Sequence, residues 1–541
     1  MMDWDNLFYC MFTREPKMHS ALNRSVDTQQ NLGGTAPVNL ASAVAVSRGA
    51  SYLTIQTLIT SIAQALAFAV LARIITPSEV GILAVLSLIV ALSQALNGAA
   101  FQQAATKFIG ELGQGSKEAA SAVFYQSIRV TLTLSVPIAV CVFVGAPVLA
   151  SALLSSAAEA GLFRFLAVDV LVYSGVLPVA IGTVLGMNRF KAAAIIGSAG
   201  TIIRQGLIII LIILTRNFVG LVLGWIVSDL AMLAAYGLFI IHNLGLPKNP
   251  FSLRKLISFS WPLSFGSVIG FASSWFDRAV LIAFVPLASL GVYNAVLYAF
   301  GVLNGMTGSV NNALLPAYSG ITGRSGLESC RRATWLGSRY ASLTLVPLAF
   351  GLFATARLAL TIFVGQAYVS GTESLMILSL VFAFTLFGLP SGPMLVALSQ
   401  TRAAMWITIA TVLLGIASAY VLLPLVGITG ASIARGVAMV VSLGLTLAVL
   451  RRKNAIQIDI KTMWKSLVAG GVMAGVLVIA QMILYSRILL PAYVVLGGIV
   501  YLAVLRILKA VQGHDIELIG KYLGSRLGFV SKVLGAILVA E

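Results

Sequence analysis

Charged side chains inside apolar segments are the residues of this sequence best suited to chemistry. Asp277 and Arg278 are adjacent within SSWFDRAVLIAF, residues 273–284. Each charge in a bilayer core costs several kcal/mol unless it meets water or a partner. Sequence neighbours lie about 100° apart around a helix, so the two side chains point in different directions. We expect Arg278 to face a substrate path and Asp277 to fix the outer end of its helix, with ion coupling as the other role open to Asp277.

Two polar stripes accompany these charges. In the segment 259–285, serines recur at helical spacing and end at Arg278, so they share one helix face. These serines are Ser260, Ser264, Ser267 and Ser274. The corresponding stripe of segment 51–72 consists of Thr54, Thr57, Thr60, Ser61 and Gln64. Such stripes either line a hydrated path or let helices pack closely with hydroxyls bonding across the interface, and both interpretations stay open.

The remaining charges in apolar runs widen the set of candidates. Arg204 and Asp229 lie near the middle of consecutive segments, so we expect a buried ion pair between them, structural or functional. Arg73 either anchors the outer interface or reaches a cavity, and Arg435 either lines a path or extends to the outer surface. Candidate substrate-binding residues are Arg278, Arg73, Arg204, Arg435, Ser267, Ser274 and Gln64. Candidate structural or coupling charges are Asp277, Asp229 and Asp169.

Composition identifies the chain as an integral membrane protein. Of its 541 residues, 59% are hydrophobic and 10% are charged, whereas soluble domains carry about 25% charged residues. The three cysteines are scattered and only three histidines occur. This composition gives no sign of a disulfide framework or a metal cluster, and we expect no cofactor, no metal and no catalytic residues.

Apolar segments and basic residues together predict the membrane topology. A spanning helix needs about 20 apolar residues, and about fourteen such segments run from residue 51 to residue 508. Most Lys and Arg residues fall on the two tails and on alternate loops, which is the positive-inside pattern. We therefore expect both termini in the cytoplasm. The net charge of +18 then reflects membrane topology and does not indicate nucleic-acid binding.

An internal repeat predicts the arrangement of these helices. Shifting the chain by 210 residues places Gly81 on Gly291 and Arg129 on Arg339, along with other turn glycines and prolines. Because the shift spans six helices, the two halves are parallel repeats related by an axis along the membrane normal. The predicted parts are a cytoplasmic tail (1–48), two six-helix bundles (49–250 and 251–455), an additional helix pair (456–510) and a cytoplasmic basic tail (511–541).

Four motifs carry a family resemblance. These are ARIITPSEVGIL (72–83), GAAFQQAATKFIGE (98–111), NRFKA (188–192) and FDRAVLIAFVPLASLGVY (276–293). In order and spacing they resemble the multidrug/oligosaccharidyl-lipid/polysaccharide exporter superfamily, in its polysaccharide-exporter branch of Wzx-type oligosaccharide flippases. The resemblance implies an all-α, MATE-like fold of about fourteen transmembrane helices, with two six-helix bundles in a V-shaped pseudo-two-fold pair and two C-terminal helices. In the related lipid II flippase these two helices form a groove for the lipid tail, and the resemblance implies the same for 466–508.

The resemblance also implies a function. Such a protein moves a polyprenyl-diphosphate-linked oligosaccharide from the cytoplasmic to the outer leaflet by alternating access. Arginines in a wet cavity suit this substrate, because guanidinium groups donate bidentate hydrogen bonds to phosphate oxygens. The expected partners are the lipid-linked oligosaccharide, membrane lipids, glycan-assembly enzymes and a coupling ion, H⁺ or Na⁺.

Two other functions were weighed against this one. A cation-coupled multidrug antiporter of the same superfamily usually needs unpaired carboxylates in its cavity, whereas the first stripe has no acid and Arg278 repels cations. A membrane glycosyltransferase or polymerase generally has a long outer loop with paired carboxylates. The outer loops here are short and hold isolated acids, so the sequence favours a transporter over an enzyme.

Overall fold

The computed structural model describes residues 40–112, 116–245, 247, 249–324 and 326–511, and this part of the chain forms helices and no strands. Residues 52 onward form one compact unit. Fourteen helices in the described part are long and apolar enough to cross a membrane, which confirms the number expected from the sequence. The predicted tails fall largely outside the described residues. Residues 40–48, assigned to the N-terminal tail, are helical and continue into the first span, which starts at Ser51, since the run LASAVAVSR contains no helix breaker.

The first six spans belong to the N-terminal half. Four of them are single continuous helices, whereas the second and fourth each contain a π-helical stretch. In chain order the elements are α3 (Leu40–Ile74), α4 (Pro77–Ser93), η1 (Gln94–Gly98), α5 (Ala99–Leu112), α6 (Lys117–Val144), α7 (Ala146–Leu154), η2 (Ala157–Glu159), α8 (Ala160–Asp169), η3 (Val170–Val176), α9 (Leu177–Gly186), α10 (Phe190–Thr215) and α11 (Val219–Leu244).

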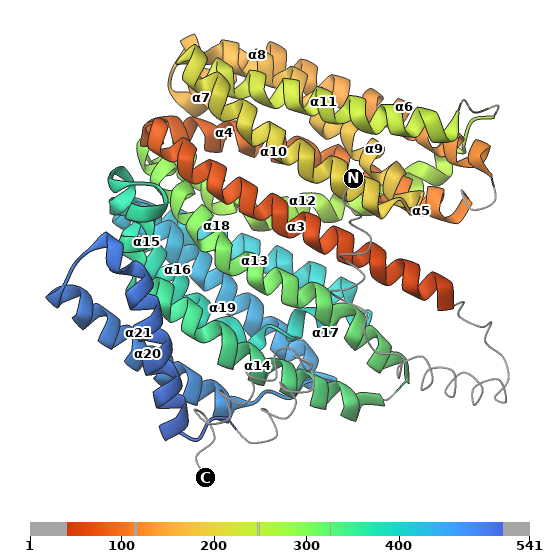
Figure 1. Ribbon diagram of the computed structural model, residues 1–541. Coiled ribbons are helices and arrows are strands. Elements are labelled where there is room, and N and C mark those ends of the chain that lie inside the picture. Colours follow the sequence, from red (N-terminus) through yellow and green to blue (C-terminus); the bar gives the residue numbers. More distant parts are fainter. Residues whose placement is uncertain (1–39, 113–115, 246, 248, 325, 512–541) are drawn as a thin grey trace, which may run out of the picture. The chain divides into compact units, whose positions relative to one another are not determined.

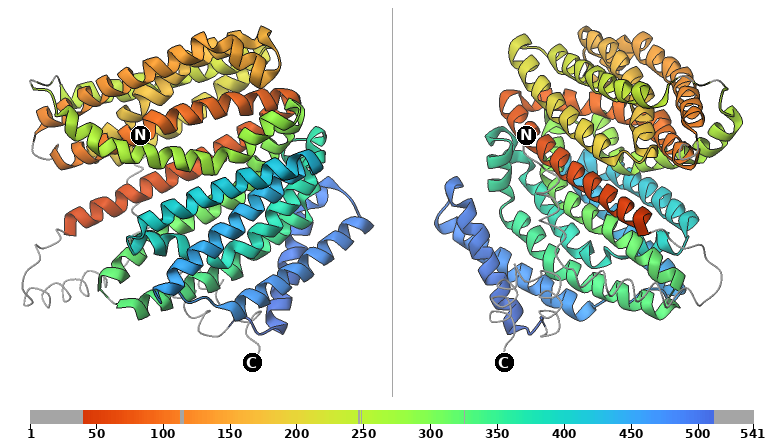
Figure 2. Two further views of the ribbon diagram at one scale, coloured as in Figure 1. Left: turned by 180° about the vertical axis from the view of Figure 1, so that it is seen from behind. Right: turned by 45° about the vertical axis from the view of Figure 1, so that its right-hand side comes forward.

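The next six spans form the C-terminal half, and two further spans follow. The elements are α12 (Leu253–Phe284), α13 (Leu287–Arg324), α14 (Gly326–Ala354), α15 (Ala356–Phe363), η4 (Gln366–Gly371), α16 (Thr372–Thr385), η5 (Leu386–Gly388), α17 (Ser391–Ala397), α18 (Thr401–Val426), α19 (Ile428–Arg452), α20 (Ile460–Ile483), η6 (Arg487–Leu489) and α21 (Leu490–Ile507). In Figures 1 and 2, α4 to α11 lie together in one bundle and α13 to α19 in another.

The crossing of α4 and α13 joins the two halves through equivalent residues. A Cβ atom on Gly81 would lie 2.1 Å from the Leu287 carbonyl oxygen, and one on Gly291 would lie 1.8 Å from the Pro77 carbonyl oxygen. Since the repeat aligns Pro77 with Leu287 and Gly81 with Gly291, the two contacts are one contact repeated by the internal symmetry. Glycine is required at both positions because only a missing side chain allows the backbones to approach so closely.

The turn TPSE starts α4 with a capping box. The Thr76 hydroxyl accepts a hydrogen bond from the backbone N–H of Glu79, whose carboxylate accepts from the Thr76 backbone N–H. Pro77 occupies the first turn, where its lack of an N–H costs nothing. The motif that carried part of the family resemblance therefore has a direct structural role. It sets the start of the helix that crosses α13.

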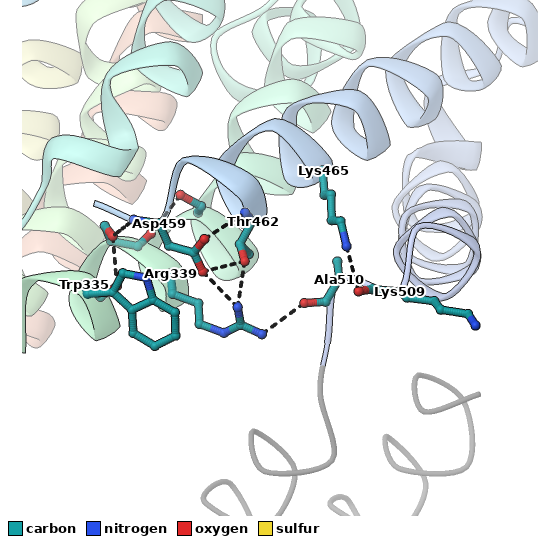
Figure 3. A network of polar contacts seen from close by, with 9 residues as sticks. Trp335, Arg339, Asp459, Thr462, Lys465, Lys509 and Ala510 are labelled. Atoms are coloured by element: carbon teal, nitrogen blue, oxygen red, sulfur yellow. Dashed lines mark hydrogen bonds and ion pairs between the residues drawn. The ribbon is translucent and has the colours of Figure 1, made fainter. Parts of the chain in front are cut away.

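The additional pair α20 and α21 is fastened to α14 by a buried polar cluster (Figure 3). One nitrogen of Arg339, Nη1, lies 2.8 Å from Asp459 Oδ2 and 2.7 Å from the Thr462 hydroxyl oxygen. The second, Nη2, donates to the Ala510 carbonyl at 3.1 Å. Burial alone would raise the pKa of Asp459, but hydrogen bonds from Thr462 and Arg339 outweigh it and hold this pKa below its usual value.

Candidate functional site

A polar cavity of about 420 Å³ lies between the two halves of the chain. Its walls come from α3, α4, η1, η3, α10 and α11 of the N-terminal half and from α12 and α13 of the C-terminal half. The polar lining residues are Gln64, Ser87, Gln94, Thr201, Arg204 and Gln205. The aromatic lining residues are Phe68, Tyr173, Trp225, Trp275 and Tyr298. Both π-helical stretches contribute, η1 through Gln94 and η3 through Tyr173, which agrees with the frequent use of π-bulges at functional sites.

Arg204 is the cation in the wall of this cavity. Its Nη1 atom donates to both carboxylate oxygens of Asp229, each at 2.9 Å, so the ion pair expected from the sequence is present. The guanidinium also lies over the rings of Tyr173 and Trp225, at 4.7 and 5.2 Å from their centroids. Arg204 remains 16% exposed while Asp229 is 1% exposed. The pair therefore presents its positive member to the cavity and keeps its negative member behind it.

Asp169 lies behind the same pair on α8. It is fully buried, and its carboxyl group lies within hydrogen-bonding reach of the carboxyl group of Asp229. It interacts electrostatically with Arg204 and Asp229. The N-terminal half thus places two carboxyl groups beside one guanidinium. Two adjoining buried carboxyl groups do not both ionise readily, so this pair is suited to binding a proton or a small cation.

In the C-terminal half, Asp277 connects three helices. Its Oδ2 atom lies 2.6 Å from Nε of Arg435 on α19 and also accepts a hydrogen bond from the hydroxyl of Tyr293 on α13. Its Oδ1 atom accepts from the backbone N–H of Arg278 at 2.8 Å. Asp277 is completely buried. Its strongest partners therefore come from other helices, and they hold the end of α12 against α13 and α19.

Arg278 follows Asp277 but has a different environment. Its side-chain Nε lies 4.0 Å from Asp277 Oδ1 and makes no hydrogen bond within the described chain. Its Nη2 atom donates to the Ser274 carbonyl at 2.9 Å, and the guanidinium lies 3.5 Å from the ring centroid of Trp275. Trp275 lines the polar cavity, and Tyr298 in the same wall interacts electrostatically with both Arg278 and Arg204. Arg204 therefore lines the cavity, whereas Arg278 contacts the lining residue Trp275 and is not itself among the lining residues.

The other predicted residues are distributed unequally around this cavity. Gln64 lines it, whereas Ser267 and Ser274 do not. The Ser274 hydroxyl donates to the Gly270 carbonyl of its own helix, and the Ser274 carbonyl accepts from Arg278 and Arg435. Arg435 lines a separate cavity of about 340 Å³ inside the C-terminal half, whose wall includes several Ser and Thr hydroxyls. The serine stripe of α12 thus lies largely outside the polar cavity.

A second large feature is an apolar groove with a volume of about 1180 Å³. It is formed by α3, α13, α14 and α15 together with the additional helices α20 and α21. Leu66 and Val70 line it from α3, and Tyr493 and Tyr501 line it from α21. Arg73 is the one charged residue in its lining, and it donates a hydrogen bond to the Ile362 carbonyl. The groove therefore suits an apolar chain and has a cation at one position.

Helix α3 separates the apolar groove from the polar cavity. Gln64 and Phe68 face the cavity, while Leu66 and Val70 face the groove. Phe68 stacks on Tyr298 of α13, with ring centroids 3.8 Å apart and ring planes within 7°. The seam between α3 and α13 is thus closed by one aromatic pair at this level. A polar compartment and an apolar compartment lie on its two sides.

The sequence analysis missed most of the cavity wall. It did not select Gln94, Gln205 or the aromatic residues, although two of the latter stand at helical spacing from selected charges. Trp275 precedes Arg278 by three residues, and Trp225 precedes Asp229 by four. These spacings put each ring on the same face as the charge. These spacings are the sequence signal that indicates the two tryptophans as neighbours of the charges.

Comparison with known proteins agrees with this architecture. The model of a family described as polysaccharide biosynthesis protein matches residues 70–373, more than half of the chain. No curated protein matches the sequence. The lipid II flippase MurJ in an inward closed conformation superposes with a TM-score of 0.69 at 13% identity, covering 85% of this chain and 98% of MurJ. An inward-facing multidrug resistance MATE family transporter of the MOP superfamily gives 0.56 at 17% identity, covering 75% and 98%.

The similarity to these solved structures establishes the fold, and the match to the family model establishes the family. An outward-facing MATE family transporter gives a TM-score of 0.53 at 17% identity over 75% of this chain and 95% of its own. The fourteen spans, with two half-chain bundles and an added helix pair, agree with the multi-pass architecture of these transporters. The chain belongs to the polysaccharide biosynthesis protein family within the multidrug/oligosaccharidyl-lipid/polysaccharide exporter superfamily, and it is a multi-pass membrane protein of the flippase and transporter fold.

Proposed function

We propose that this chain moves a lipid-linked oligosaccharide, a glycan carried on polyprenyl diphosphate, from the cytoplasmic to the outer leaflet by alternating access. The observation that carries this proposal is the placement of a cationic polar cavity and an apolar groove on two faces of one helix, α3. A substrate with a charged head and a long apolar tail needs both environments at the same time.

The cavity suits a diphosphate because its cations keep unused hydrogen-bond capacity. Arg204 uses Nη1 for Asp229, and its remaining N–H groups have no partner among the described residues. Outside the cavity lining, Arg278 and Arg435 of the C-terminal half stand beside Asp277 and give that cluster a net positive charge, and the cluster meets the cavity wall at Trp275. Guanidinium groups bind phosphate oxygens in a planar, bidentate manner. In a low-dielectric site this attraction is stronger than in water.

The groove suits the polyprenyl chain. Its lining is apolar over α3, α13, α14, α20 and α21 apart from Arg73 and a few hydroxyl groups. A tail held there stays in lipid-like surroundings while the head occupies the cavity, so neither part crosses an environment of the wrong polarity. The additional helices, held by the Arg339 cluster, form one side of this groove.

Orientation, coupling and partners complete the proposal. We place the protein in the cell membrane with both termini in the cytoplasm, as the distribution of Lys and Arg favours. Asp169 and Asp229 form the coupling site for H⁺ or Na⁺, because these two buried carboxyl groups adjoin each other beside the Arg204 guanidinium. Glycan-assembly enzymes supply and consume the substrate.

The alternatives fit the cavity less well. None of the described residues that line it is acidic, so a cationic drug would meet Arg204 with no opposing carboxylate on the surface. A membrane glycosyltransferase or polymerase generally needs carboxylates at the surface that meets its substrate. The lining offers amides, hydroxyls and aromatic rings instead.

Reconstitution into liposomes tests the proposal. Outward movement of a labelled polyprenyl-diphosphate sugar is measured beside efflux of a cationic dye. We expect lipid movement without dye efflux, and we expect Arg204→Gln to reduce lipid movement while Arg402→Gln, an exposed arginine outside both compartments, leaves it unchanged. Because Arg204→Gln leaves Asp229 unpaired, the double variant Arg204→Gln/Asp229→Asn controls for folding. Dye efflux without lipid movement would refute the proposal.

A further inference from the structure

The end of the α20–α21 pair that is fastened to Arg339 carries positive charge that the described chain does not neutralise. From residue 374 to residue 511 the sequence holds a single acidic residue, Asp459, although Lys and Arg are frequent in this stretch. Asp459 is buried and is already paired with Arg339. The three lysines at this end, Lys461, Lys465 and Lys509, form the basic cluster, and none of them makes an ion pair with a carboxylate in the described part of the chain.

The lysines of the basic cluster lie close to one another (Figure 3). Lys465 on α20 donates a hydrogen bond to the carbonyl of Lys509 at the end of α21, at 2.8 Å. Lys461 lies one turn earlier on α20, and both it and Arg339 repel Lys465 electrostatically. Arg339 and Lys465 each donate to a carbonyl at the C-terminal end of α21, so they serve to hold that helix. The side chains of Lys461 and Lys509 are exposed and make no hydrogen bond within the described residues, so they are available to a ligand.

An exposed apolar stripe on α20 runs from the basic cluster into the membrane span. Its members, Ile460, Trp464 and Val468, follow at steps of four residues and are 52%, 57% and 49% exposed. None of them lines the apolar groove, so the stripe is a different face of α20 from the one proposed for the polyprenyl chain. Because α20 is one of the candidate spans, this exposed face meets lipid. A tryptophan beside lysines at the end of a span is typical of the membrane interface.

Charge and polarity together indicate the molecule that covers this face. A phospholipid places its acyl chains along an apolar stripe and its phosphate at the level of the interface. A zwitterionic headgroup adds an ammonium group, which the lysines repel, whereas an anionic headgroup keeps a net negative charge that they attract. Basic pockets between the ends of membrane helices suit anionic headgroups for this reason. The basic cluster, with no carboxylate of its own to offset it, therefore favours an anionic phospholipid over a zwitterionic one.

We infer that the basic cluster and the apolar stripe of α20 form a binding site for one anionic phospholipid. In the proposed orientation this lipid belongs to the cytoplasmic leaflet. Its headgroup offsets the repulsion among the lysines, and its acyl chains cover the stripe. Since α20 and α21 form one side of the apolar groove, the bound phospholipid supports that wall of the groove from outside. The site does not depend on which substrate the protein moves.

Fluorescence quenching by brominated lipids tests the site in the full-length protein. The protein is placed in phosphatidylcholine nanodiscs that contain brominated phosphatidylglycerol or, in a parallel sample, the same amount of brominated phosphatidylcholine. The quenching that belongs to Trp464 is the difference between the wild type and Trp464→Phe. We expect the anionic lipid to quench Trp464 more strongly than the zwitterionic lipid. Lys461→Gln/Lys509→Gln should weaken this preference by roughly fivefold for each lysine removed, the factor expected for one Lys near an anionic surface.

Trp406 provides the matched control. It is 64% exposed on α18, the eleventh span, and follows Arg402 by four residues, so it presents a ring and one cation at the same side of the membrane as the start of α20. Its quenching, obtained from Trp406→Phe, should show a weaker preference than that of Trp464 and should not change in Lys461→Gln/Lys509→Gln.

Three results would overturn the phospholipid site. They are equal quenching of Trp464 by the two lipids, an equal preference at Trp406 and Trp464, and a preference at Trp464 that survives in Lys461→Gln/Lys509→Gln. Because both lysines are exposed, thermal unfolding of this variant in pure phosphatidylcholine nanodiscs should match that of the wild type. Each overturning result leaves the proposed lipid movement intact, since that movement rests on the polar cavity and the apolar groove.

Discussion

The α4–α13 crossing predicts a shift in conformation when either of its glycines gains a methyl group. A Cβ atom at Gly81 would lie 2.1 Å from the Leu287 carbonyl oxygen, and one at Gly291 would lie 1.8 Å from the Pro77 carbonyl oxygen. Ordinary contact begins at 3.4 Å, so the helices must separate by more than 1 Å at this level. Overpacking of this kind costs about 1–3 kcal/mol. If these two helices separate in the opposite state of the alternating-access cycle, a methyl group at Gly81 or Gly291 shifts the equilibrium toward that state by about 5- to 150-fold.

Pulsed electron spin resonance measures this shift directly. Spin labels at Ser78 in the N-terminal half and Arg357 in the C-terminal half are both exposed. We expect Gly81→Ala and Gly291→Ala to add a longer distance between the labels in nanodiscs. Gly237→Ala is the matched control, because a Cβ atom there meets nothing within 4 Å. Distance distributions for Gly81→Ala that match those of Gly237→Ala would refute the idea that this crossing closes one side of the molecule.

Three further predictions concern the added helices. Arg339→Leu should lower the free energy of unfolding by about 3–5 kcal/mol, because it leaves buried Asp459 unpaired. The double variant Arg339→Met/Asp459→Asn should lose less stability than Arg339→Leu, as measured by thermal unfolding in detergent. The pKa of Asp459 is lowered in the folded state, so its contribution to the free energy of unfolding is present above about pH 4 and is lost as the pH falls through the folded pKa. Asp459→Asn should remove this pH-dependent part of the stability. Gly498→Trp fills the apolar groove and should slow lipid movement in liposomes, whereas Gly475→Trp, outside the groove, should not.

The sequence predicted the features that depend on local pattern or on symmetry. The number of spans follows from the length of apolar runs, and the Arg204–Asp229 pair follows from two charges at similar depth on consecutive helices. The Gly81–Gly291 correspondence was found by sliding the chain on itself, and the structure makes it one repeated backbone contact. Each of these inferences needs only the spacing of residues along one or two helices.

The partners of the buried charges and the residues of the cavity wall depend on which helices pack against each other. Asp277 finds its main partner, Arg435, across 158 positions of sequence, and no periodicity in either helix indicates that pairing. The serine stripe of α12 shares one face as expected, yet only Trp275 of that helix lines the polar cavity. A helical face can be read from spacing, but its neighbour is set by tertiary packing. The glutamine and aromatic wall was missed for the same reason, since its members come from helices far apart in the chain.

The two halves share packing residues but differ in the charges of the sixth and twelfth spans. The repeat aligns Gly81 with Gly291, whereas it aligns Trp225 with Arg435 and Asp229 with Met439. As a result the N-terminal half holds two carboxyl groups beside Arg204, and the C-terminal half holds Arg278 and Arg435 beside one carboxylate. A symmetric scaffold lets two halves move against each other around equivalent crossings. Under the proposed function, the buried acids of the N-terminal half are the groups available to a coupling ion, and the equivalent crossings of the repeat are where the two halves would move against each other.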